Sequence, residues 1–92
     1  MRVSFYATLR EIAGQKTLEI DLPDGATLQQ LLDAVLLRLP GMREKLFLED
    51  GSLRGYVHVF INGRDAPFLK EKLNTITHPS DEIDIFPAVG GG

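Results

Sequence analysis

Apolar and polar side chains alternate in four short stretches of the chain, and this period of two predicts β-strands. The stretches are residues 2–7, 16–22, 56–61 and 82–86. In the first, Val3, Phe5 and Ala7 are expected to face the core. In the last, Ile83 and Ile85 have that position. Because proline cannot donate a ladder hydrogen bond, sheet pairing is expected to fade at Pro87.

The strongest helical pattern begins at Thr27 and is expected to stop at Pro40-Gly41. Its apolar residues recur with helical spacing and form one stripe: Leu28, Leu31, Leu32, Val35, Leu36 and Leu39. Thr27, with Gln30 three residues later, fits a capping box at the start of the helix. Leu37 lies off the stripe, so it is either exposed or covered by the next segment.

The order of elements is therefore strand, strand, helix, strand, strand, with a short helical turn over 8–13 and a short helical turn or loop over 42–48. Strands on either side of a long helical connection can lie parallel. This favours an α+β fold of the β-grasp (ubiquitin-like) type, a mixed sheet covered on one face by one main helix. A ferredoxin-like sandwich would need a second long helix. Residues 64–80 read mostly as loop, anchored by Phe68, Leu69, Leu73 and Ile76.

We expect one domain over residues 1–86 and a flexible tail over 87–92. The chain has 92 residues, a formal net charge of −3 and no cysteine, which excludes a disulfide scaffold, a thiolate zinc site and a cysteine nucleophile. The mild acidity argues against nucleic acid as a partner. No apolar run is long enough to span a membrane and no signal peptide is evident, so the expected location is cytoplasmic.

Candidate chemistry inside the domain is sparse. His58 and His78 lie in different elements, without a clear carboxylate cluster for a metal. No serine sits in a nucleophile elbow, and an autonomous active site is not expected. Asp81, Glu82 and Asp84 lie in a C-terminal stretch that has no basic residue. They indicate either a basic partner surface or an ordinary solvated strand edge.

Two features point to partner binding. Alternation places Phe60 and Phe86 on the outer face of the sheet, where they form an exposed apolar patch unless the 64–80 loop folds over them. The chain then ends in three glycines, which lack a Cβ and could enter a narrow channel. The α-carboxylate is a poor electrophile until a nucleotide-using partner converts it to a mixed anhydride. The alternative is a frayed terminus.

The chain resembles the MoaD/ThiS-type sulfur carriers of the ubiquitin-like superfamily, and the MoaD branch most. The similarity is carried by residues 5–14 (FYATLREIAG), 39–43 (LPGMR) and 57–63 (VHVFING). Residues 81–89 (DEIDIFPAV) before the terminal glycines are the most specific match. The order and spacing of these motifs make the resemblance strong, although each motif alone is weak.

The resemblance implies that an E1-like enzyme of the MoeB/ThiF type adenylates Gly92 with ATP and that a sulfur-donor protein supplies a thiocarboxylate. The carrier itself would bind no cofactor. In the MoaD branch it is the small subunit of molybdopterin synthase and inserts its tail into the large, MoaE-type subunit. The implied site is Gly92 and Gly91, with Phe60, Phe86, Pro87, Val89 and Gly90 contacting partners.

Three departures from the family pattern concern the sulfur acceptor. The tail has three glycines in place of two, Ala88 replaces a frequent second proline, and the segment 47–54 is longer than in compact members. Longer relatives include carriers for cysteine biosynthesis or tRNA thiolation and proteins conjugated to lysines. These remain the alternatives to molybdopterin synthesis.

Overall fold

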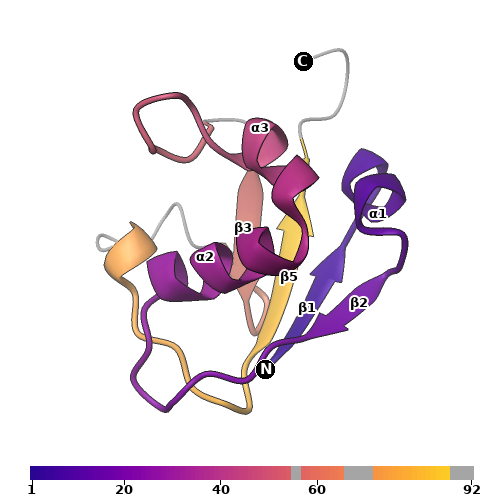
Figure 1. The fold of residues 1–92 in the computed structure, drawn as a ribbon. Coiled ribbons are helices and arrows are strands. Elements are labelled where there is room, and N and C mark those ends of the chain that lie inside the picture. The colour runs from indigo at the N-terminus through magenta and orange to yellow at the C-terminus, as the bar shows by residue number, and fades with distance from the viewer. Residues whose placement is uncertain (55–56, 66–71, 88–92) are drawn as a thin grey trace.

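In the computed structural model, residues 1–54, 57–65 and 72–87 are described. Expectations about 55–56, 66–71 and 88–92, including Phe68, Leu69 and the glycines of the tail, lie outside these ranges. The chain forms one five-stranded sheet in the order β2-β1-β5-β3-β4, with its helices on one face (Figure 1). The strands are β1 (Arg2–Phe5), β2 (Thr17–Glu19), β3 (His58–Ile61), β4 (Arg64–Asp65) and β5 (Glu82–Phe86).

The centre of the sheet is the parallel pair of β1 and β5, in which Val3 lies beside Ile83 and Phe5 beside Ile85. The other neighbours pair antiparallel: β1 with β2, β3 with β5, and β3 with β4. The parallel pairing is possible because the intervening chain crosses over the sheet as a helix. This mixed sheet with one main helix confirms the predicted fold class.

Helix α2 (Leu28–Arg38) covers the inner face, and its start and stripe are as predicted. The Thr27 hydroxyl accepts the Gln30 backbone N–H at 3.2 Å, and the Gln30 side chain accepts the Thr27 N–H at 2.8 Å. The stripe is buried except at Leu39, which is half-buried. Leu37 is 85% exposed, so the segment that follows α2 does not cover it. Pro40-Gly41 ends α2, and the short helices η1 (Pro40–Met42) and α3 (Arg43–Leu46) follow.

Three predicted details near the N-terminus are wrong. Strand β1 ends at Phe5 because Ala7 turns the chain with a φ of 53°, and α1 (Thr8–Ala13) begins directly after it. Ala7 is exposed and does not face the core. Strand β2 ends at Glu19, although the Ile20 N–H still donates to the Met1 carbonyl at 2.9 Å.

The region after β3 is more ordered than predicted. Asn62 and Gly63 both have positive φ, as a tight hairpin turn requires, and they return the chain as β4, which the hydrophobic pattern did not indicate. The short helix η3 (Lys72–Asn74) packs against α2, and Leu73 contacts the core as predicted. Ile76 is 51% exposed, so its predicted role as an anchor is wrong. Within the described ranges, every helix is too short or too polar to cross a bilayer.

Candidate docking surface and C-terminal tail

The outer face of the sheet is defined by the residues of β5 that alternate with the buried Ile83 and Ile85. These outer residues are Glu82, Asp84 and Phe86. The strand register places Asp84 between Ser4 of β1 and Phe60 of β3. It also places Phe86 opposite His58.

Three aromatic rings gather at the end of β5 where the chain leaves the sheet. Tyr6 stacks on Phe86 with ring centroids 4.2 Å apart and an interplanar angle of 8°. Phe60 meets Phe86 edge-on at 5.4 Å. All three side chains are half-buried, and we call them the aromatic patch. Phe60 and Phe86 were placed on this face from the sequence, whereas Tyr6 was not proposed as a site residue.

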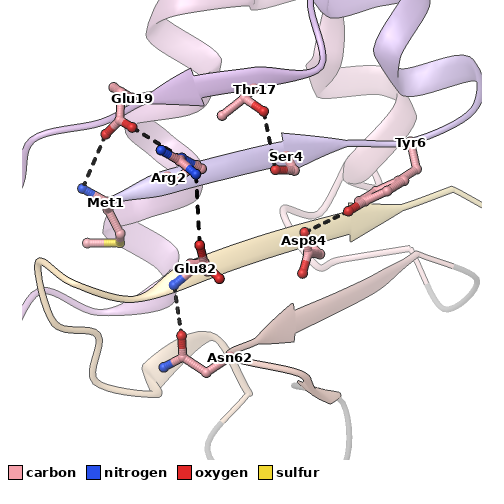
Figure 2. A network of polar contacts seen from close by, with 9 residues as sticks. All are labelled: Met1, Arg2, Ser4, Tyr6, Thr17, Glu19, Asn62, Glu82 and Asp84. Atoms are coloured by element: carbon pink, nitrogen blue, oxygen red, sulfur yellow. Dashed lines mark hydrogen bonds and ion pairs between the residues drawn. The ribbon is translucent and has the colours of Figure 1, made fainter.

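Tyr6 also links the patch to the central strand. Its hydroxyl donates a hydrogen bond of 3.0 Å to Oδ1 of Asp84 (Figure 2). This bond to a carboxylate, together with desolvation, raises the pKa of the Tyr6 phenol. A neutral phenol at physiological pH therefore holds the Asp84 carboxylate in a defined position.

The opposite end of the outer face is polar. Arg2 lies between two carboxylates, 3.5 Å from Glu19 and 4.0 Å from Glu82 (Figure 2). The Asn62 side chain accepts the Glu82 backbone N–H at 2.9 Å. The aromatic patch and the charged side chains of Arg2, Glu19 and Glu82 thus occupy different ends of the same face.

The acidic stretch predicted as one feature separates into different environments. Asp81 is buried, and its oxygens accept hydrogen bonds of 2.8 Å from the Asn62 side chain and from the His78 backbone N–H. It therefore has a structural role and is not available to a basic partner. Glu82 is paired with Arg2. Asp84 is the acidic residue that borders the aromatic patch.

The two histidines lie apart, as expected. His58 is exposed on the outer face, and His78 lies in the turn before β5. Nδ1 of His78 is 2.7 Å from Oδ1 of Asp24, and this hydrogen bond raises the pKa of the imidazole. No group of three or more metal-ligating side chains occurs within the residues that the structure describes.

The tail begins directly at the aromatic patch. Pro87 follows Phe86 and is half-buried, while Val89, Gly90, Gly91 and Gly92 lie outside the described residues. The last strand is therefore the element that joins the patch to the tail.

One main helix across a mixed sheet, with parallel β1 and β5 at the centre, defines the β-grasp class of ubiquitin-like domains. The chain belongs to the ThiS family, a family of ubiquitin-like sulfur carriers, whose model matches residues 3–92.

Relatives of known sequence and structure agree with this assignment. Small archaeal modifier protein 1 of Haloferax volcanii is 34% identical over 92 residues, all of both chains. Its crystal structure superposes with a TM-score of 0.89 over 100% of this chain and 98% of the other. A chain in the Amycolatopsis orientalis BexX/CysO complex is 32% identical, with a TM-score of 0.82 over 99% and 98% of the two chains. The molybdopterin synthase sulfur carrier subunit of Arabidopsis thaliana is 28% identical over 95 residues, covering 100% of this chain and 82% of the plant protein.

Proposed function

We propose that this protein carries sulfur on Gly92, as a C-terminal thiocarboxylate formed after adenylation by an E1-like enzyme. The observation that supports this most is the continuity of β5 with the tail. The central strand ends in the aromatic patch and runs directly into a glycine-rich terminus, in a chain that matches a carrier family through residue 92. A partner bound to the patch would thus receive the tail at its active site.

The proposed chemistry uses only the terminal carboxylate of this chain. A carboxylate oxygen attacks the α-phosphorus of ATP, and pyrophosphate leaves. A persulfide sulfur of a donor protein then attacks the acyl carbon, AMP leaves, and an acyl disulfide joins the two proteins. A thiol reductant cleaves the S–S bond, which releases the donor and leaves the thiocarboxylate on Gly92. Gly91 and Gly92 suit this role because a side chain there would obstruct a narrow channel. Phe60, Phe86 and Pro87 would contact the partner, and Val89 and Gly90 would line the way into its active site.

For the sulfur acceptor, we propose molybdopterin synthesis, with this chain as the small subunit beside a MoaE-type large subunit in the cytoplasm. The relative from Arabidopsis thaliana named as a molybdopterin synthase carrier supports this assignment. A second function, conjugation to protein lysines, is favoured by a different observation. Two small archaeal modifier proteins of Haloferax volcanii match the full length of this chain at 34% and 33% identity.

Intact mass spectrometry of the protein from its native host tests the carrier function. We expect a species heavier than the unmodified chain by the mass difference between sulfur and oxygen. It should be absent from a chain that lacks Gly90, Gly91 and Gly92, whereas a chain without Gly92 alone still ends in two glycines. Failure to find this species during active sulfur metabolism, together with no adenylation, would contradict the proposal.

Two further experiments distinguish the role in molybdopterin synthesis from conjugation to protein lysines. Restored cofactor synthesis in a strain lacking its own carrier supports the molybdopterin role. Lysine adducts that retain the tail, and that disappear when Gly90, Gly91 and Gly92 are deleted together, support the modifier role.

A further inference from the structure

The carboxylates on the outer face differ in whether a basic side chain lies close enough to form an ion pair. Glu19 and Glu82 share Arg2, at 3.5 and 4.0 Å. Asp84 forms no ion pair with any cation in the described part of the chain, and its side-chain hydrogen bond there comes from the neutral Tyr6 hydroxyl at 3.0 Å. Within the described residues, Asp84 is therefore held by a neutral hydroxyl and has no ion-pair partner.

The Asp84 carboxylate lies where a docked partner would cover it. Asp84 is half-buried, lies opposite Phe60 in the register, and precedes Phe86 by two residues. Tyr6 engages only Oδ1, and an ionised carboxylate can accept about four hydrogen bonds. An apolar partner surface over the aromatic patch would strip water from this carboxylate. Burial of an unpaired charge is strongly unfavourable, so a partner that covers the patch needs a cation at this point.

We propose that Asp84 receives an arginine side chain of the E1-like activating enzyme, a proposal that rests on the function proposed above. A guanidinium fits this place better than an ammonium because its planar fork matches a carboxylate and its flat faces pack on aromatic rings. The patch thus selects partners that present an arginine beside an apolar surface.

The test measures ATP–pyrophosphate exchange by the activating enzyme of the source organism at increasing concentrations of the carrier. Asp84→Asn removes the charge but keeps a carbonyl oxygen that can accept the Tyr6 hydrogen bond. Loss of one partner of a buried charge pair weakens association strongly, so we expect KM for the carrier to rise about tenfold or more. The kcat should stay near that of the wild type, because Asp84 does not touch the reacting atoms.

Glu19→Gln is the matched control, since it makes the same chemical change on the same face at a carboxylate already paired with Arg2. We expect its KM to stay within about twofold of the wild type, as is usual for an exposed ion pair. An unchanged KM for Asp84→Asn would overturn the proposal. An equal rise in both variants would also overturn it, because it would indicate diffuse attraction rather than a specific contact. Asp84→Ser serves as a second neutral variant if the asparagine variant does not fold.

A chain without Gly90, Gly91 and Gly92 separates this inference from the proposed function. It should support no exchange but still compete with the wild type for the enzyme. Exchange that depends on the terminal glycines but not on the charge at position 84 would leave the proposed function intact and remove the arginine contact. An enzyme that does not activate the wild type would remove both.

Discussion

Replacing Ala7 with glycine is predicted to stabilise the protein, although alanine-to-glycine changes usually destabilise. Ala7 has φ 53° and ψ −129°. It is the second residue of a tight turn closed by the Leu9 N–H and the Tyr6 carbonyl at 3.1 Å. These angles match the first central position of a type II′ turn, which glycine dominates.

The magnitude follows from two opposing terms. Removing the strain of a residue in a sparsely populated region recovers about 1–3 kcal/mol. The greater freedom of glycine in the unfolded chain costs about 0.4–1 kcal/mol. Because the Ala7 side chain is exposed, little burial is lost, and we expect a net gain of about 1 kcal/mol. For a domain of this size that raises Tm by about 4–8 °C.

Urea and thermal unfolding followed by circular dichroism measure this change. Ala34→Gly is the control, because Ala34 lies inside α2 and packs against the core. There the same substitution should cost at least about 1 kcal/mol. A loss of stability in Ala7→Gly similar to that in Ala34→Gly would refute the assignment of strain to Ala7.

Three further substitutions test other parts of the domain. Asp24→Asn should lower the pKa of His78 toward its ordinary value of 6.5, as measured by NMR titration of the imidazole. Because folding raises the His78 pKa, the interaction of His78 with Asp24 stabilises the folded protein fully below about pH 6.5, and this stabilisation is lost as pH rises through the His78 pKa of the folded state. An unchanged His78 pKa in Asp24→Asn would contradict this reasoning. Thr27→Ala should cost about 0.5–2 kcal/mol in urea unfolding through loss of the capping box, and an unchanged midpoint would argue against it. Asn62→Ala should cost more than about 1 kcal/mol in the same assay. It removes the hydrogen bonds of the Asn62 amide with the buried Asp81 carboxylate and the Glu82 N–H, and it places alanine at a positive φ. Wild-type stability would contradict a structural role for this side chain.

The elements that could be predicted are those whose signals are local. Helix α2 carries its capping box, its apolar stripe and its stop within a short stretch of sequence. The outer positions of Phe60 and Phe86 follow from simple alternation along their own strands. Such features require no knowledge of which strand lies beside which.

The features that were missed depend on contacts between distant residues. Tyr6 joins the aromatic patch only because β1 and β5 are parallel neighbours. Asp81 reads as a surface carboxylate, but it is buried because Asn62, 19 residues earlier, turns its amide toward it. Strand β4 consists of polar residues and is held by the turn before it rather than by a hydrophobic pattern.

The position of β5 has a consequence for synthesis of the protein. It is the last strand in the sequence but the middle one in the sheet, between β1 and β3. A ribosome therefore completes every other strand before it makes the one that joins them, and the pairing of β1 with β5 spans almost the whole described chain. Folding must wait for these distant contacts, which are slow to form. A chain interrupted before β5 lacks the middle of its sheet, so β1 and β3 have nothing between them to pair with, and a partner that recognises the folded sheet would not bind the incomplete product.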